Sequence, residues 1–133
     1  MASTRRKGFS GPRSNPEEAI VRAALAAHGA DPGVLLLRNV VKTVPNPWVP
    51  GAFLDFGLGE GTPDVVGSVV CPCPTCGTPG ARPLGLEFKT PTGRAAAHQL
   101  AVHEAWRSQG WLVELPRSVA DVTAILDAAR RGR

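Results

Sequence analysis

The chain has 133 residues, of which 43% are hydrophobic and 20% are charged, and its formal net charge is +4. This length suits one domain with a single core, and the apolar content is ordinary for a globular protein. No apolar run is long enough for a transmembrane helix, and the first residues lack the apolar core of a signal peptide. We therefore expect a cytoplasmic protein without a membrane partner.

The charges are unevenly distributed along the chain. Residues 1–15 contain basic but no acidic residues, and Arg130, Arg131 and Arg133 end the chain. Residues 16–129 hold 8 of the 15 basic residues and all 11 acidic ones, a net charge of −3. An acidic body suits a carboxylate metal site and basic ends suit non-specific phosphate contacts, although short basic termini are equally compatible with simple solvation.

The chain begins with a segment that has no periodic pattern and then enters a helix. Residues 1–15 mix Arg, Gly, Pro and Ser, which predicts a disordered basic tail. A helix is predicted over residues 16–28, because Ser14 or Asn15 can cap its start and Gly29 can end it.

The next apolar segment, VLLLRNVV at residues 34–41, predicts a buried strand that ends polar at Arg38 and Asn39. Arg38 suits either a phosphate contact or pairing with a nearby carboxylate. The three prolines in residues 43–52 predict a loop, where Trp48 either covers the edge of the core or stacks on a base.

Two further strands are predicted around a glycine-rich loop. Residues 53–56 alternate in polarity and predict a short strand, and residues 65–70 are rich in valine and predict another. The glycines of residues 57–61 superficially suggest a nucleotide-binding motif. That motif requires a helix immediately afterwards, so the strand that follows excludes it.

An insert at residues 71–83 contains the cysteines Cys71, Cys73 and Cys76 within the predicted hairpin connection. A closed zinc site takes four ligands. A structural zinc ion would therefore need a fourth group from His28, His98, His103 or a second subunit. The alternatives are that the three cysteines are reduced surface thiols or that they form an adventitious disulfide during preparation.

Charged residues flank and follow these strands. Asp64 precedes one strand, and in LEFK the alternation sends Glu87 and Lys89 to one face and the apolar residues to the other. Two carboxylates suit Mg²⁺ or Mn²⁺, and a lysine two residues on can hold a metal-bound water. A Glu-x-Lys pair alone is common on surfaces, but the GTPD turn and the TPTGR segment make this combination more specific.

The C-terminal third predicts a helix at residues 95–109, a strand at 111–115 and a helix at 119–130. In the first of these helices, Gln99 and His103 lie one turn apart on a shared face. His103 either reaches phosphate or has a structural role.

Taken together, GTPDVVG, GLEFKTPTGR and Gln99 resemble the virus-type replication-repair nuclease (VRR-NUC) domain, a branch of the PD-(D/E)xK nuclease superfamily. The resemblance covers about residues 16–125. Pro63 and Asp64 match the PD element, and Glu87, Phe88 and Lys89 match the (D/E)xK element. The cysteine-containing insert departs from the family pattern.

The resemblance implies a restriction-endonuclease-like mixed α/β sheet flanked by helices, forming one domain over residues 16–130. It also implies metal-dependent hydrolysis of DNA phosphodiester bonds. Asp64, Glu87 and the Phe88 carbonyl would bind one or two Mg²⁺ or Mn²⁺ ions, Lys89 would position a water, and Gln99 would support the site.

The family also has a glutamate in its N-terminal helix, which here is Glu17 or Glu18. The spacing to Val21 and Leu25 favours Glu18, which would hold a second metal ion or a water. Both glutamates are also favoured in a first helical turn by the helix dipole alone.

The expected partner is DNA, contacted by Arg38, Asn39, Arg94 and Arg117. Family members include dimers that act on branched DNA, so branched DNA and a homodimer are both compatible with the resemblance. Two rival functions are a DNA-binding module that has lost catalysis and a zinc-stabilised interaction module centred on the cysteines.

Overall fold

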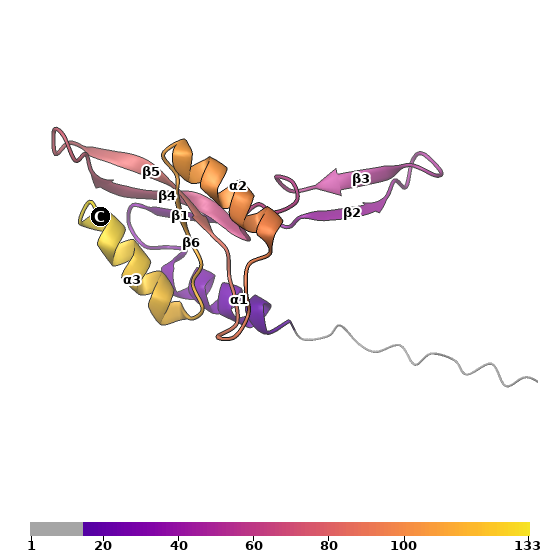
Figure 1. Ribbon diagram of the computed structural model, residues 1–133, viewed down its shortest axis with the longest axis horizontal. Helices are drawn as coiled ribbons and strands as arrows, with labels where there is room; N and C mark the ends of the chain where they lie inside the picture. The colour runs from indigo at the N-terminus through magenta and orange to yellow at the C-terminus, as the bar shows by residue number, and fades with distance from the viewer. Residues whose placement is uncertain (1–14) are drawn as a thin grey trace, which may run out of the picture.

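The computed structural model describes residues 15–133, which form an α/β domain (Figure 1). Except for Asn15, the predicted basic tail of residues 1–15 lies outside the described residues. Helix α1 spans Pro16–His28, and the Asn15 side chain accepts a hydrogen bond of 3.0 Å from the amide of Glu17. This contact satisfies one of the free amides of the first turn and confirms Asn15 as the cap.

The main sheet is mixed and has the strand order β1-β4-β5-β6. Its strands are β1 (Val34–Arg38), β4 (Val65–Pro72), β5 (Pro79–Leu86) and β6 (Leu112–Glu114). Strand β4 is antiparallel to both of its neighbours, whereas β6 runs parallel to β5. Mixed α/β architecture is thus confirmed.

The hairpin of β4 and β5 is longer than the sequence predicted. Its pairing runs from Val65 opposite Leu86 to Pro72 opposite Pro79. The predicted insert at residues 71–83 is therefore largely strand, and only residues 73–78 form the tip. Cross-strand hydrogen bonding continues through this polar and proline-containing sequence, which local composition did not indicate.

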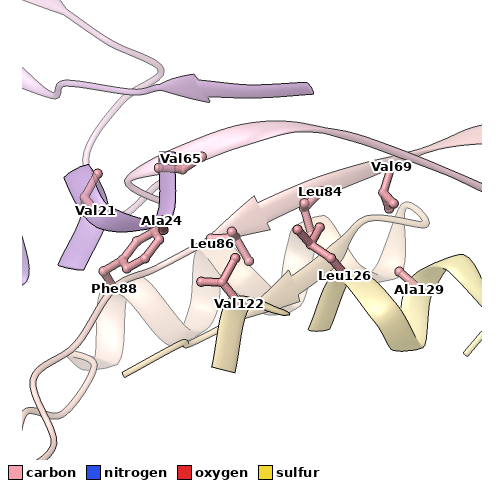
Figure 2. Close-up of a cluster of buried hydrophobic side chains, with 10 residues drawn as sticks. All are labelled: Val21, Ala24, Val65, Val69, Leu84, Leu86, Phe88, Val122, Leu126 and Ala129. Carbon is pink, nitrogen blue, oxygen red and sulfur yellow. The ribbon is translucent and has the colours of Figure 1, made fainter. Parts of the chain in front are cut away.

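Helices cover both faces of the sheet (Figure 1). Helix α1 and helix α3 (Val119–Arg130) pack on one face, and helix α2 (Ala97–Ser108) lies on the other. Figure 2 shows the core between the sheet and the helices α1 and α3. It is formed by Val21, Ala24, Val65, Val69, Leu84, Leu86, Phe88, Val122, Leu126 and Ala129. None of the helices in residues 15–133 is long and apolar enough to span a membrane.

A glycine in β5 allows close packing on the α2 face. A Cβ atom at Gly85 would lie 2.8 Å from Cγ of Pro63 and 3.6 Å from the ring of Trp106. The Trp106 ring also packs against Trp111, with 4.4 Å between ring centroids. Gly85 therefore lets the loop before Asp64 and helix α2 approach the sheet together.

A second, two-stranded sheet pairs β2 (Lys42–Pro45) with β3 (Phe53–Phe56). The predicted loop at residues 43–52 is therefore wrong for its first three residues, because these pair with β3. Trp48, at the far end of this hairpin, is 80% exposed. The prediction that Trp48 covers the core edge is wrong, since the hairpin carries it away from the core (Figure 1).

Strand β1 also differs from its prediction. It ends at Arg38, and Leu35 and Leu37 are 50% and 52% exposed. The prediction of a buried strand over residues 34–41 is wrong because β1 lies at the sheet edge and only one of its faces is covered. An apolar run does not distinguish an edge strand from a central one.

Candidate active site

The segment Glu87–Lys89 continues the line of β5 beyond its last residue. The Glu87 amide donates to the Glu114 carbonyl at 3.0 Å, and the Lys89 amide donates to the Pro116 carbonyl at 3.1 Å. Phe88 is fully buried in the core, while Glu87 and Lys89 point to the α2 side and are 2% and 7% exposed. The alternation seen in the sequence therefore holds here, and it places two charged groups in a protected position.

A compact hydrogen-bond network joins Glu87, Lys89 and Gln99. The Gln99 amide nitrogen donates to Glu87 Oε1 at 2.7 Å. The Lys89 ammonium lies 3.2 Å from the same carboxylate oxygen and 3.2 Å from Gln99 Oε1. Gln99 Oε1 also accepts from the Ala96 amide at 2.9 Å, which ties the network to the start of α2. Gln99 thus holds the orientation of both charged groups.

Asp64 lies beside this network at the same end of the sheet. It directly precedes β4, whose first residue pairs with the last residue of β5. Its Oδ2 atom accepts a hydrogen bond of 2.8 Å from the Phe88 amide. The pairing of two neighbouring strands therefore brings together two carboxylates that are 23 positions apart in the sequence.

Asn39 braces the loop that leads to Asp64. Its side-chain nitrogen donates to the Thr62 hydroxyl and to the Pro63 carbonyl, both at 2.8 Å, and its oxygen accepts from the Leu58 amide at 2.9 Å. Asn39 is also among the predicted DNA contacts. The structure shows its side chain fixing the turn before Asp64, a role that no local pattern indicated.

The two carboxylates resist ionisation. Burial raises the pKa of Glu87 to about 7, the charge of Asp64 adds to the effect, and the hydrogen bond from Lys89 opposes it. Burial also raises the pKa of Asp64, while the Phe88 amide counteracts this shift. Desolvation and like-charge repulsion are the forces that a bound cation would relieve.

Three buried polar atoms among the described residues have no hydrogen-bond partner: Glu87 Oε2 and both ring nitrogens of His103. Glu87 Oε2 lies 4.0 Å from His103 Nε2, which is beyond hydrogen-bond range. Burial lowers the pKa of His103, and the ring is fully enclosed. Direct contact of His103 with a phosphate is therefore excluded, and the ring instead backs the Glu87 carboxylate.

A pocket of about 190 Å³ opens beside Asp64 and is lined by Glu17, Glu18, Arg38 and Asn39, among others. Glu18, which the sequence analysis favoured for the site, forms ion pairs with Arg38 and with Arg22. Those hydrogen bonds lower the pKa of Glu18. Of the two outcomes left open for Arg38, the structure shows the carboxylate pair.

Glu17 has a different electrostatic role from its neighbour. Its charge contributes to the raised pKa of both Asp64 and Glu87. Glu17 therefore adds negative potential at the carboxylates, whereas the charge of Glu18 is balanced by arginines. The two glutamates are adjacent in the sequence but project from different sides of α1. The spacing to Val21 and Leu25 favoured Glu18, whereas the charge that acts on Asp64 and Glu87 is that of Glu17.

The loop after Lys89 is closed by Arg117. Its guanidinium donates to the carbonyls of Thr90 and Gly93. Arg94, in the same loop, is exposed. Of the three arginines predicted to contact DNA, Arg38 pairs with Glu18, Arg117 shapes the loop, and Arg94 is exposed to solvent.

The cysteines lie at the β4–β5 hairpin, away from the carboxylates (Figure 1). All three thiols are free, and hydrogen bonds from Thr78 and Cys73 lower the pKa of the Cys76 thiol to about 7. His28 is bound to Asp31 and Thr123, and His103 is buried under Glu87. No group of three or more His, Cys, Asp or Glu side chains in residues 15–133 is placed to hold a metal ion.

Comparison with known protein families, curated proteins and solved structures gives no match to this chain.

Proposed function

We propose that this chain is a metal-dependent nuclease that hydrolyses DNA phosphodiester bonds, with a restriction-endonuclease-like core of the PD-(D/E)xK type and the VRR-NUC branch as its family. The observation that carries the proposal is the convergence of Asp64 and Glu87 at one end of the sheet. Lys89 lies against Glu87, and Gln99 binds both residues of that pair.

The donor set suits Mg²⁺ or Mn²⁺. Both carboxylates are destabilised in their ionised form, and Glu87 Oε2 has no partner among the described residues. Mg²⁺ commonly binds through one or two carboxylates and completes its shell with water and phosphate oxygens. Asp64, Glu87 and the Phe88 carbonyl can therefore hold the ion without a third acidic side chain.

When bound, the divalent ion supplies Lewis acidity that activates a water molecule and offsets charge on the phosphate. The chain supplies a fixed positive charge beside it, because Gln99 holds the Lys89 ammonium against Glu87. Such preorganised charge needs no rearrangement as negative charge develops on the phosphate. The Phe88 amide holds one oxygen of Asp64 and so orients its carboxylate.

DNA is the proposed substrate, and the resemblance suggests branched DNA in replication, recombination or repair. The exposed Arg94, in the loop that follows Lys89, supports contact with the DNA backbone. A cytoplasmic location is part of the same proposal.

Cleavage assays test the proposal directly. Wild type, Asp64→Ala and Lys89→Ala are compared on linear, flapped and four-way-junction DNA with Mg²⁺, Mn²⁺ or EDTA. Glu104→Gln is a matched control, since this carboxylate lies on α2 and is 78% exposed. We expect metal-dependent cleavage that falls at least about 100-fold in both site variants, the loss typical of removing a group that stabilises the transition state.

The control should cleave like wild type. DNA binding without cleavage under every metal condition would contradict the proposal of an enzyme and favour a DNA-binding module. Circular dichroism of each variant separates loss of activity from loss of folding.

A further inference from the structure

The tip of the β4–β5 hairpin, residues 73–78, lies at the opposite end of the hairpin from the candidate active site (Figure 1). Two of the three cysteines, Cys73 and Cys76, lie in this tip. The Gly77 amide donates to the Cys73 carbonyl at 2.9 Å, which closes a single helical turn. Helix geometry places the Cα atoms of residues three apart about 5 Å from each other. A disulfide requires about 4.4–6.8 Å, so this turn has the spacing that a disulfide needs.

The two thiols are also in contact. Hydrogen bonds from Thr78 and from the Cys73 side chain reach the Cys76 sulfur and lower the pKa of this thiol to about 7. Cys76 is exposed, whereas Cys73 is half-buried. An accessible thiol of lowered pKa beside a second thiol is the arrangement typical of redox-active cysteine pairs.

The backbone of the tip is held without either thiol. The Cys73 amide donates to the Thr78 carbonyl at 2.9 Å, and Gly77 has the left-handed conformation that ends the turn, with a φ of 72°. The strands on both sides pair as far as Pro72 and Pro79. A disulfide between the thiols can therefore form and break while the hairpin stays paired.

A groove of about 620 Å³ runs beside the tip, and Cys71 and Cys73 line part of it. Arg82 and Arg133 also line the groove, and none of its lining residues is acidic. Arg82 donates to the Arg133 carbonyl at 3.3 Å, which joins the two residues. Guanidinium groups bind carboxylates through paired hydrogen bonds. The groove therefore suits a small anionic ligand next to the thiols.

The donor set argues against a closed metal site at the tip. A structural zinc ion takes four ligands, and no group of three or more His, Cys, Asp or Glu in the described part of the chain is placed to hold a metal ion. The pair in the tip supplies only two sulfur atoms. In the cytoplasm, the location proposed above, a disulfide of this kind is typically transient and either catalytic or redox-sensing.

We propose that Cys73 and Cys76 form a thiol–disulfide exchange site whose oxidant is a low-molecular-weight disulfide that carries carboxylates. The groove arginines Arg82 and Arg133 bind those carboxylates. The site is separate from the carboxylates of the candidate active site, and the proposal does not depend on nuclease activity.

The exchange takes two steps. The Cys76 thiolate attacks one sulfur of the small disulfide, so that a mixed disulfide forms and one small thiolate leaves. The Cys73 thiolate then attacks the Cys76 sulfur, which forms the Cys73–Cys76 disulfide and releases the second small thiolate. The chain gives two electrons to the small disulfide, and the two cysteine protons pass through solvent to the two small thiolates.

Mass spectrometry of the full chain tests the proposal, with glutathione disulfide as the probe. The reduced chain is incubated in EDTA with different ratios of glutathione to its disulfide, and free thiols are then blocked. We expect the wild type to lose two free thiols and the mass of two hydrogen atoms, with Cys73 and Cys76 joined in the peptide map. Cys71→Ser is the control and should react in the same way, because it keeps the pair.

Two further variants test the order of the steps. Cys73→Ser should retain glutathione as a mixed disulfide on Cys76, because the thiol that completes the exchange is missing. Cys76→Ser should react at least about 10-fold more slowly than wild type, because it lacks the exposed thiol of lowered pKa. Circular dichroism of each variant separates loss of reactivity from loss of folding.

Disulfides of different charge test the ligand class. Arg82→Gln should slow the reaction with glutathione disulfide about 5-fold and leave the reaction with neutral hydroxyethyl disulfide unchanged, because only the first ligand carries carboxylates. Arg131→Gln is the matched control, since Arg131 is exposed and does not line the groove. It should react like wild type with both disulfides.

Three results would overturn the exchange site: no disulfide at any glutathione ratio, a disulfide that still forms in Cys76→Ser at the wild-type rate, or zinc that stays bound to the purified chain and blocks the reaction. Equal slowing of both disulfides by Arg82→Gln would overturn the assignment of a carboxylate-bearing ligand.

Discussion

Glutamine in place of Glu87 is expected to stabilise the metal-free domain increasingly as the pH rises. In the folded chain the pKa of Glu87 is raised from its usual 4.5 to about 7, chiefly by burial. Between these two pH values the folded state holds a proton that the unfolded chain has released. Stability from this group is therefore present below pH 4.5 and is lost as the pH rises toward 7 and above.

The size of the effect follows from the two pKa values. A difference of about 2.5 pH units corresponds to a loss of about 3 kcal/mol in the wild type, at about 1.36 kcal/mol per unit. Glutamine does not titrate and can still accept the hydrogen bond from Gln99. The free energy of unfolding of the variant should thus exceed that of the wild type by up to about 3 kcal/mol at pH 8. This difference should vanish near pH 4.5.

Wild type and Glu87→Gln must be compared at each pH, because His103 changes the stability of both in the opposite direction to Glu87 as the pH rises. Burial lowers the pKa of His103, so its contribution to stability is lost as the pH falls below its usual 6.5. That contribution is common to both proteins and largely cancels in the difference between their free energies of unfolding.

Urea unfolding at several pH values in EDTA measures this difference. The same titration with Mg²⁺ at pH 8 provides a second readout, since an ion that binds only the folded state stabilises it by about 2.7 kcal/mol at 100 times its dissociation constant. Wild type should gain stability from Mg²⁺ and the variant much less. A variant that is less stable than wild type at pH 8 in EDTA would refute the reasoning.

Three further predictions concern single residues. A Cβ at Gly67 would lie 1.7 Å from a backbone oxygen of β1, so Gly67→Ala should lower the free energy of urea unfolding by at least about 2 kcal/mol. Gly80→Ala is the control and should be nearly neutral, because a Cβ at Gly80 would have no atom within 4 Å. Asn39→Ala should lower the free energy of urea unfolding by about 2–3 kcal/mol, because it leaves the buried Pro63 carbonyl without its hydrogen-bond donor. An unchanged unfolding midpoint would show that the loop does not need this hydrogen bond. In calorimetric titrations, Glu17→Gln should weaken Mn²⁺ binding roughly 5-fold, because the charge of Glu17 acts on Glu87. Glu18→Gln should weaken it less, because Arg22 and Arg38 already balance the charge of Glu18. A larger effect of Glu18→Gln would show that Glu18 is the glutamate that contributes to metal binding.

Much of the architecture follows from local sequence signals. Asn15, one of the two residues predicted to cap the first helix, caps α1, and Ser118 caps α3 in the same way; both caps depend on contacts within three residues. The alternation in LEFK correctly separates Phe88 from Glu87 and Lys89, because strand geometry requires neighbouring side chains to face opposite ways.

Predictions that depended on distant contacts were less accurate. The apolar run at residues 34–41 is as hydrophobic as a central strand, yet β1 is an edge strand with two half-exposed leucines. Trp48 is the most exposed large hydrophobic side chain among the described residues, at 80%, and nothing in the sequence around it indicates that the β2–β3 hairpin holds it away from the core. Both outcomes depend on which segments pair, and pairing is decided by the whole sheet.

The sequence by itself determined which chemical groups this protein can bring to a site: two carboxylates, a lysine and a glutamine within a recognisable motif. Only the tertiary structure decided how they act. The pairing of β4 with β5 brings Asp64 to Glu87, and α2 places Gln99 and His103 beside the buried Glu87. Burial and proximity change the pKa of a carboxyl group through desolvation and repulsion, and both are properties of three-dimensional arrangement.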